Sequence, residues 1–466
     1  MTNLRHFFTI VRASTAFDCT FQEHLTVTQS LASVSLESPV FSVPHQALVP
    51  VNGYPSAQVD IPQSRMFIIK KLLAAFREKH PDTPAYDASQ GDGGASLPGV
   101  PHHLLERALE LLKQNGTAYD PPTGTLAFRK ATAEQYWQFS AEIGYNAENI
   151  AATDGGRDAL LKIYQAMTAL GTGRIGDVLL VSRVPWISYL WGPYGLGMNV
   201  LLAPGVEADG WEYTEEGIAA SVAYCAKHGG GRRIAGMVIT SPDNPTGRTL
   251  SMDRQIALAQ KAFSLGIPFV LFDWIYHQIA EGEPADINAL LSAFSPADRA
   301  RIIVLDGLTK SLGASNIRAA HVVASKQVVE FIASRSSHGV MPNFFGQAVA
   351  QAAYEIGFRK AAASIIEPTN ASRAIVRDFI RAKGYRAVIG DGGYYAFIDC
   401  TEAIQRGNLA DSVALVEYMA ANFGLTAIAG SYFSEAGKNW IRFSYALPPE
   451  ITAKALERFD EAMRSL

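Results

Sequence analysis

A lysine with an arginine close behind it is the first feature of this chain that could do chemistry. Lys310 stands in the segment Gly307-Leu-Thr-Lys-Ser-Leu-Gly313, just after a predicted strand, and Arg318 follows eight residues later. A lysine amine that is kept deprotonated in a cleft can form a Schiff base with a carbonyl group. Most lysines are solvated surface residues, so Lys310 is a candidate catalytic residue only in combination with the other candidate residues.

A carboxylate at the end of an apolar strand is the second feature. The run Ile267–Asp273 (IPFVLFD) is predicted to be a buried strand, and Tyr276 lies three residues beyond its last residue. Burying a carboxylate is costly unless a cation partners it. A protonated pyridine nitrogen would be such a partner for Asp273.

Two further segments could hold an anion and a flat ring. Asn149–Leu160 is typical of a strand end, a glycine turn and a helix start, where the N–H groups of Gly156 and Arg157 could bind an anion. Trp186, within Ser182–Tyr189, could stack on a heteroaromatic ring. A generic turn and a core tryptophan are the ordinary alternatives.

The segment Ser241-Pro-Asp-Asn-Pro-Thr-Gly247 adds an amide after the predicted strand Ile234–Thr240. Its Asn-Pro pair predicts a rigid turn, from which Asn244 could donate to a ring oxygen. All these candidates lie at or after the C-terminal ends of predicted strands, where open α/β sheets bind ligands. An anion site, an aromatic ring, an amide with a tyrosine, a carboxylate and a lysine together predict pyridoxal phosphate as the cofactor.

The elements that must position these residues alternate between helices and short apolar strands. Near-continuous apolar strands separated by helices predict a mostly parallel sheet with both faces covered. Seven strands are predicted: Asn149–Ala152, Asp177–Val181, Asn199–Leu202, Ile234–Thr240, Ile267–Asp273, Ile302–Asp306 and His321–Ala324.

Three regions are predicted from the change in pattern along the chain. Residues 1–85 form an N-terminal arm that ends in an amphipathic helix at Met66–Phe76, and residues 86–325 form the large cofactor-binding domain. Residues 326–466 contain long helices and then the strands Tyr394–Asp399 and Trp440–Ala446, which predicts a smaller α+β domain.

Composition narrows the class of protein. The chain has 466 residues, 48% hydrophobic and 18% charged, with a net charge of −4, so neither disorder nor a broad nucleic-acid-binding surface is expected. Three widely spaced cysteines fit a reducing compartment, and no apolar run approaches the roughly 20 residues of a membrane helix. We therefore expect a soluble, cytoplasmic protein that binds a small molecule, without nucleic-acid or membrane partners.

Common alternative motifs do not fit. Gly171–Gly176 matches G-x-G-x-x-G, but the predicted strand follows it instead of preceding it, so the dinucleotide-binding order is reversed. The ten histidines show no metal-ligand spacing, and no metal site is predicted.

The order of the candidate residues resembles that of the class I/II aminotransferases of the fold-type I pyridoxal-phosphate enzymes, over roughly residues 86 to 466. The resemblance implies a large domain with a mostly parallel seven-stranded sheet and a smaller α+β C-terminal domain. Its most specific matches are S-P-D-N-P-T-G at 241–247, D-x-x-Y at 273–276, Lys310 with Arg318, and W-I-R-F-S-Y at 440–445.

The resemblance implies catalytic roles for Lys310, Asp273 and Tyr276. Lys310 would bond to the cofactor as a Schiff base and shuttle the substrate α-proton, and Asp273 would hold the pyridine nitrogen. Asn244 and Tyr276 would donate to the phenolic oxygen of the ring. Arg442, assisted by Asn244, would bind the substrate carboxylate, a geometry that suits an arginine.

It also implies how the rest of the cofactor is held. Trp186 would stack on the ring, and the phosphate would be bound by Gly156, Arg157, Arg318 and Thr309, the last substituting for a serine that many members carry where this chain has Gly307. Tyr119 matches the tyrosine that reaches the phosphate of the neighbouring subunit, which implies a homodimer.

Four departures from the family pattern bear on the substrate and the reaction outcome. They are the Gly307 position, the Ala319-Ala320 pair after Arg318, the glycine segment Gln90–Ser96, and an arm before residue 86 that is longer than the family needs. Transfer of an amino group from an amino acid to a keto acid is the first hypothesis. Elimination, replacement, cyclisation or oxidation of an amino acid is the alternative, because the same residues would serve. A non-enzymatic regulator is a third, although residues 1–85 lack the charge and helix pattern of a DNA-binding head.

Overall fold

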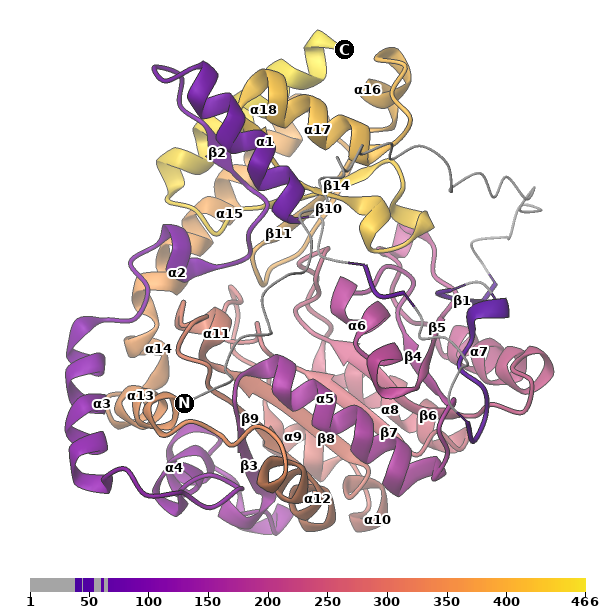
Figure 1. The fold of residues 1–466 in the computed structure, drawn as a ribbon, viewed down its shortest axis with the longest axis vertical. Helices are drawn as coiled ribbons and strands as arrows, with labels where there is room; N and C mark the ends of the chain where they lie inside the picture. Colours follow the sequence, from indigo (N-terminus) through magenta and orange to yellow (C-terminus); the bar gives the residue numbers. More distant parts are fainter. Residues whose placement is uncertain (1–37, 44, 54–59, 63–65) are drawn as a thin grey trace, which may run out of the picture. The chain divides into compact units, whose positions relative to one another are not determined.

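The computed structural model describes residues 38–43, 45–53, 60–62 and 66–466. Residues 1–37 of the predicted N-terminal arm lie outside these ranges. The described elements all belong to one unit, Leu36–Leu466, and they build a large sheet and a smaller sheet (Figure 1).

The large sheet has eight strands, and the seven predicted strands are all among them. Five central strands run parallel, whereas the pairs β8–β9, β9–β3 and β1–β5 are antiparallel, so the mostly parallel sheet is confirmed. In spatial order the strands are β1 (Val40–Phe41), β5 (Asn199–Leu202), β4 (Val178–Val181), β6 (Ile234–Thr240), β7 (Phe269–Asp273), β8 (Ile302–Gly307), β9 (Ala320–Val323) and β3 (Ile150–Thr153).

The eighth strand comes from the segment predicted to be an arm. Val40 and Phe41 pair with Leu202 and Leu201 at the edge of the sheet. A two-residue strand is too short to give a periodic signal in the sequence, which is why it was not predicted.

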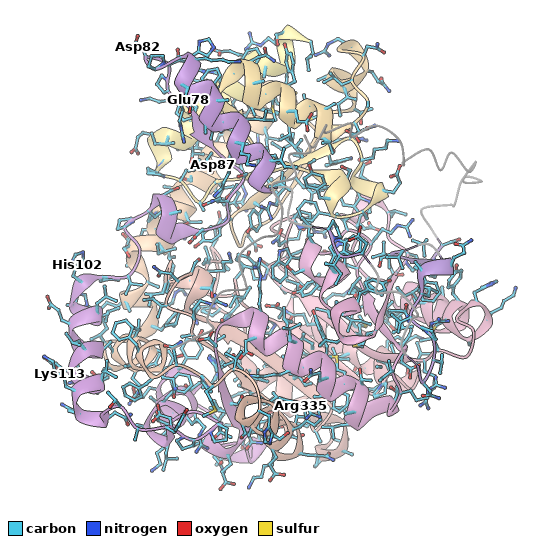
Figure 2. The ribbon with its side chains drawn as sticks, viewed as in Figure 1. Glu78, Asp82, Asp87, His102, Lys113 and Arg335 are labelled. Carbon is cyan, nitrogen blue, oxygen red and sulfur yellow. The ribbon has the colours of Figure 1, made fainter. Side chains whose placement is uncertain are left out.

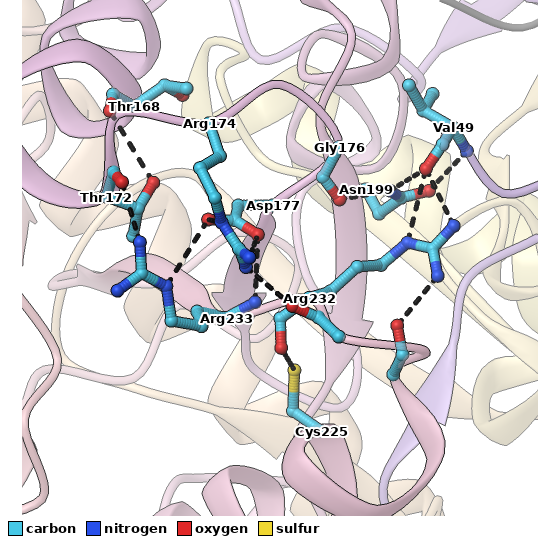
Figure 3. A network of polar contacts seen from close by, with 12 residues as sticks. Val49, Thr168, Thr172, Arg174, Gly176, Asp177, Asn199, Cys225, Arg232 and Arg233 are labelled. Atoms are coloured by element: carbon cyan, nitrogen blue, oxygen red, sulfur yellow. Dashed lines mark hydrogen bonds and ion pairs between the residues drawn. The ribbon is translucent and has the colours of Figure 1, made fainter. Parts of the chain in front are cut away.

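Side-chain and backbone hydrogen bonds hold the following segment, His45–Gly53, to the large sheet (Figure 3). The Asn199 side chain accepts from the Val49 N–H at 2.9 Å and donates to the Val49 carbonyl at 3.0 Å. Arg232 Nη2 donates to the same carbonyl at 2.7 Å. Val49 is thereby buried although it lies outside any long element.

The smaller sheet is antiparallel, with the order β10 (Ala387–Ile389), β11 (Tyr395–Asp399), β14 (Trp440–Ser444) and β13 (Ile428–Ala429). A separate parallel pair joins β12 (Leu425–Thr426) to β2 (Tyr86–Asp87). The two strands predicted for this region are β11 and β14, each close to its predicted bounds.

Helices surround both sheets. In the first half of the chain they are α1 (Met66–Lys79), α2 (Gly93–Ser96), α3 (His102–Asn115), α4 (Leu126–Ala131), α5 (Gly156–Ala166), α6 (Ile187–Trp191) and α7 (Glu215–His228). In the second half they are α8 (Met252–Ser264), α9 (Ile287–Ser292), α10 (Pro296–Arg299), α11 (Leu308–Ser311), α12 (Lys326–Ser337), α13 (Phe344–Glu355), α14 (Phe358–Ala361), α15 (Ala363–Lys383), α16 (Thr401–Arg406), α17 (Ser412–Phe423) and α18 (Pro449–Ser465).

Each sheet has its own hydrophobic core. The core of the large sheet includes Val328 of α12 and Val349 of α13, and α5 packs against β3, β8 and β9. The core of the small sheet includes Ile69 of α1 and Leu415 of α17. The division at residues 85 and 325 stays a prediction.

Exposed polar side chains on the helices include Glu78, His102, Lys113 and Arg335, which are labelled in Figure 2. Within the described ranges, none of the helices combines the length and the apolar character that crossing a membrane requires.

Candidate active site

A cavity of about 460 Å³ lies at the C-terminal ends of β6, β7 and β8. These ends meet because the parallel register pairs Thr240 with Asp273, and Asp273 with Leu305. All three residues line the cavity. Nine residues that the sequence assigned to the cofactor line it too: Gly156, Arg157, Trp186, Asn244, Asp273, Tyr276, Thr309, Lys310 and Arg318.

Asp273 is the buried carboxylate of this cavity. The Tyr189 hydroxyl donates to its Oδ2 at 2.6 Å, and the Ile275 N–H donates to its Oδ1 at 3.1 Å. Burial raises the pKa of the Asp273 carboxyl to about 6, and the hydrogen bond from Tyr189 opposes that rise. A cation placed beside the carboxylate would offset the rest of the cost of burying its negative charge.

Lys310 reaches the cavity from the short helix α11, which begins directly after β8. Its Nζ donates to the Gly91 carbonyl at 2.6 Å, and its own carbonyl accepts from the Tyr394 hydroxyl at 2.6 Å. The amine therefore has a neutral partner and is not tied up in an ion pair with Asp273.

The start of α5 forms a corner that could hold an anion. Its cap residue Gly155 has φ +80°, and a Cβ added there would lie 2.3 Å from Arg318 Nη2, so only glycine leaves room for that guanidinium. Free N–H groups at a helix start favour an anion. The buried Thr309 hydroxyl, which has no hydrogen-bond partner, adds a donor to the same cavity.

Arg318 itself is held by backbone carbonyls. It donates to the carbonyls of Ser315 at 3.0 Å and Asp154 at 3.2 Å. Because its partners in the structure are neutral, its charge is available to a ligand in this corner.

Arg442 lies next to the cavity on β14 of the small sheet, and its side chain is buried. Its Nη1 donates to Asn244 Oδ1 at 2.9 Å and its Nη2 to the Ser89 carbonyl at 2.7 Å. Its Nε has no partner. A buried guanidinium with neutral acceptors and a free N–H suits an incoming carboxylate.

Two aromatic groups border the cavity. Trp186 meets the Tyr189 ring edge-on with a centroid distance of 5.3 Å, and the guanidinium carbon of Arg157 lies 6.0 Å from the Trp186 ring. The Tyr276 hydroxyl is 2.8 Å from the Tyr395 hydroxyl, and both side chains are buried.

Tyr119 is the predicted site residue that the structure keeps apart. Its side chain is 96% exposed and does not line the cavity. Within one subunit it therefore has no access to the residues gathered around Lys310.

Several residues of the site were missed at the sequence level. Tyr189, Ser315 and Ile275 line the cavity, and Gly91 and Tyr395 contact residues that do. Tyr189 ends the same segment as Trp186, three residues on, so helical spacing could have placed the two together. Gly91 belongs to the glycine segment Gln90–Ser96, which the family resemblance singles out, whereas nothing in the sequence connects Tyr395 to Tyr276.

Within the parts of the chain that the structure describes, no three or more His, Cys, Asp or Glu side chains are grouped so that they could hold a metal ion.

Comparison with known proteins places the chain in a family. The model of the family described as aminotransferase class I and II matches residues 88–459. The chain belongs to this family. The resemblance inferred from the sequence, and with it the class I/II aminotransferase as the type of enzyme, is confirmed.

Relatives with assigned names support the same activity. The aspartate/prephenate aminotransferase of Thermus thermophilus is 27% identical over 368 residues, covering 77% of this chain and 87% of that protein. The aspartate aminotransferase of Geobacillus stearothermophilus is 21% identical, covering 80% of this chain and 91% of its own. The alternative chemistry of elimination or replacement is not favoured by these names.

Solved structures confirm the fold of this aminotransferase. A double mutant of Thermus thermophilus aspartate aminotransferase superimposes with a TM-score of 0.72 at 24% identity, covering 87% of this chain and 97% of that one. The aromatic aminotransferase of Pyrococcus horikoshii gives a TM-score of 0.71 at 21% identity, covering 85% of this chain and 99% of that one.

Proposed function

We propose that this aminotransferase uses pyridoxal 5′-phosphate, bonded to Lys310, to move the amino group of an amino acid to a keto acid. The observation that carries the proposal is the buried carboxylate of Asp273 in the same cavity as Lys310. A carboxylate this deep needs a cation, and the protonated pyridine nitrogen of the cofactor would be that cation.

The other residues of the cavity fit the remaining parts of the cofactor. Its phosphate matches the anion-binding corner of Gly156, Arg157, Thr309 and Arg318, where glycine leaves space and the threonine hydroxyl has no other partner. Its ring would lie against Trp186.

The phenolic oxygen of the ring would accept hydrogen bonds from Asn244 and Tyr276, which both line the cavity. Burial raises the pKa of the Tyr276 phenol well above its ordinary value, so this hydroxyl stays protonated and can donate. When bound, the cofactor supplies an electron sink for the pair released as the substrate Cα–H bond breaks.

Lys310 is the group that moves the proton. Once released by the substrate, its Nζ would take the proton from the substrate α-carbon as a general base and deliver it to the former aldehyde carbon of the cofactor, the position whose protonation transfer of the amino group requires. Asp273 keeps the proton on the ring nitrogen, and a charge-assisted hydrogen bond of this kind is worth about 1.5–3 kcal/mol.

The substrate would be fixed by its α-carboxylate on Arg442. The free Nε and the neutral partners of the other two nitrogens allow a carboxylate to be accepted without breaking an ion pair. Since the relatives carry names of aspartate and prephenate aminotransferases, a donor screen begins with aspartate and the aromatic amino acids.

A homodimer is part of the proposal. Tyr119 is exposed in one subunit, and an interface that brought it to the phosphate of the neighbouring site would give it a role. A cytoplasmic location is also proposed, which suits the free, buried thiols of Cys225 and Cys400.

The test is to reduce the purified, yellow protein with borohydride and map the labelled peptide. We expect the label at Lys310, and loss of both the visible band and turnover in Lys310→Ala. Lys326→Ala is the matched control, since Lys326 lies on α12 with its amine paired to Glu148. Label at another lysine would overturn the assignment. Ammonia release without an acceptor would favour elimination.

A further inference from the structure

Tyr395 sits where three functional groups of the site come together. Its hydroxyl oxygen is 2.8 Å from the Tyr276 hydroxyl, and the guanidinium carbon of Arg442 lies 4.2 Å from the centre of its ring. It also lies against Gly91, because a Cβ added there would be 1.7 Å from the Tyr395 hydroxyl oxygen. The Gly91 carbonyl is the acceptor of the Lys310 amine.

The small sheet fixes this position. Strands β11 and β14 are antiparallel, with Tyr395 opposite Ser444 and Phe397 opposite Arg442. Residues two apart on a strand share a face, so Tyr395 and Arg442 are diagonal neighbours on one face of the sheet. The preceding residue, Tyr394, donates to the Lys310 carbonyl instead.

A buried arginine holds the turn from which Tyr395 emerges. Arg373 of α15 is fully buried and its Nη2 donates to the Gly393 carbonyl at 2.9 Å and to the Ile279 carbonyl at 3.0 Å. Ile279 follows Tyr276 in the loop after β7. One guanidinium thus ties the Tyr276 loop of the large sheet to the Tyr395 strand of the small sheet.

We infer that Tyr395 is a positioning residue that couples the Tyr276 hydroxyl, the donor to the phenolic oxygen of the cofactor, to the Arg442 guanidinium that binds the substrate carboxylate. This inference rests on the proposed function. Tyr395 acts through Tyr276 and Arg442. Its hydroxyl acts on Tyr276, and its ring acts on Arg442.

The hydroxyl acts on Tyr276. When Tyr276 donates to the ring oxygen, its own oxygen accepts from Tyr395, which makes a chain of two donors pointing at the ring. Hydrogen bonds in such a chain polarise one another and strengthen by about 10–30% each. Tyr395 thereby strengthens the stabilisation of negative charge on the phenolic oxygen.

The ring acts on Arg442. A guanidinium over an aromatic face is attracted by the quadrupole of the ring, most strongly where both groups are desolvated. Arg442 is buried without an acidic partner, so the Tyr395 face stabilises its charge without competing for a carboxylate.

Two substitutions separate these roles. Tyr395→Phe removes the hydroxyl and keeps the ring. We expect the pH midpoint of the visible absorption band of the bound cofactor to rise by about 0.3–0.5 unit. A phenolic oxygen whose negative charge is less stabilised holds more tightly the proton that it shares with the adjacent Schiff-base nitrogen. The KM for the amino acid should stay within about twofold, because the ring face that stabilises Arg442 is retained.

Tyr395→Leu removes the ring as well. We expect the same rise in the midpoint and, in addition, a KM raised about fivefold with a smaller change in kcat, because Arg442 loses the nearer of its two aromatic faces and keeps only Phe433, at 5.5 Å. Tyr213→Phe is the matched control, since this buried phenol bonds only to the carbonyls of Leu180 and Val238 in the large sheet. It should leave the midpoint and the KM unchanged.

The outcomes separate this inference from the proposed function. A purified protein that binds no pyridoxal phosphate and shows no visible band would overturn the proposed function itself. If the parent protein shows a normal band, and if both Tyr395→Phe and Tyr395→Leu keep the parent's midpoint and KM, only the role of Tyr395 is overturned. If Tyr395→Leu fails to fold, the isosteric Phe variant still decides the role of the hydroxyl.

Discussion

Tyr189 donates a 2.6 Å hydrogen bond to the Oδ2 atom of Asp273, and this bond lies at the floor of the cavity. The Tyr189 hydroxyl is in turn 3.1 Å from the Thr240 hydroxyl, which donates to it. The hydrogen-bonded chain from Thr240 to Tyr189 to Asp273 therefore joins three elements, β6, α6 and β7. Because the packing of α6 against the sheet places the Tyr189 hydroxyl, that packing influences the ionisation of the Asp273 carboxyl.

The first prediction concerns Tyr189→Phe. Loss of this donor removes a bond that favours the ionised carboxylate, so the pKa of Asp273 should rise above its value of about 6. Because the cofactor nitrogen needs the ionised form, the Kd for pyridoxal phosphate at pH 6 should increase at least about fivefold, with a smaller increase at pH 8.

Fluorescence titration of the protein with pyridoxal phosphate measures this effect. Tyr164→Phe is the matched control, since that nearby phenol is equally buried and its hydroxyl has no hydrogen-bond partner. Equal loss of affinity at both pH values in Tyr189→Phe would argue for a purely steric role.

The second prediction is the pH dependence of stability without cofactor. Asp273 has a folded pKa of about 6 against an ordinary value of 3.8, so the folded state binds the proton more tightly than the unfolded state. Its contribution to stability, about 3 kcal/mol, is present below about pH 4 and is lost as the pH rises through about 6.

The variant Asp273→Asn cannot ionise and should therefore be the more stable protein at pH 7 and about equal at pH 4. Unfolding temperatures of the two cofactor-free proteins at both pH values test this. Asp243, whose pKa burial also raises to about 6, is present in both proteins and cancels from the difference. An Asn variant that is less stable than the parent at pH 7 would contradict the upward shift of the Asp273 pKa on folding.

Part of this site follows from sequence because the chemistry sits at strand ends. Asp273 and Lys310 each follow an apolar strand, and parallel strands bring their C-terminal ends together, so these two could be placed in one cavity from order alone. Asn244 and Arg318 could be added because they follow strands or lie close behind Lys310.

Residues that reach the site by packing gave no such signal. Gly91 lies 219 positions from Lys310, and Tyr395 lies 119 from Tyr276, yet each pair is joined by a hydrogen bond. These contacts depend on how the small sheet meets the ends of the large one, which no local period encodes. The same holds for Val40 and Phe41, whose strand exists only because β5 offers an edge.

The third prediction tests the glycine at the start of α5. Gly155→Ala places a methyl group 2.3 Å from Arg318 Nη2 and must displace that guanidinium. Affinity for pyridoxal phosphate should fall at least about tenfold, because a charge-assisted contact to the phosphate is lost. Binding of inorganic phosphate to the cofactor-free protein should weaken in parallel.

Gly116→Ala separates this clash from backbone strain. Gly116 has φ +81° and ψ −160°, close to the φ +80° and ψ 169° of Gly155, but a Cβ there meets nothing within 4 Å. Both variants should lose about 1–3 kcal/mol of stability because this backbone conformation is almost restricted to glycine, and only Gly155→Ala should lose cofactor affinity. Equal affinities in the two variants would remove Arg318 from the phosphate site.

The last prediction tests whether the active site is shared between subunits. Tyr119 is 96% exposed, so its proposed contact with the cofactor phosphate must be made in the neighbouring subunit. Tyr119→Ala and Lys310→Ala proteins should each be nearly inactive alone. A hybrid dimer of the two has one site with both residues intact, because the subunit that keeps Lys310 receives Tyr119 from its partner.

Random re-pairing of equal amounts makes half of the dimers hybrids, each with one working site of two, so about a quarter of the parental activity should return. Activity after denaturation and refolding of the mixture, with hybrids verified by two different affinity tags, measures the rescue. Verified hybrids that stay inactive would place Tyr119 outside the site, since a residue acting within its own subunit cannot be supplied by the partner.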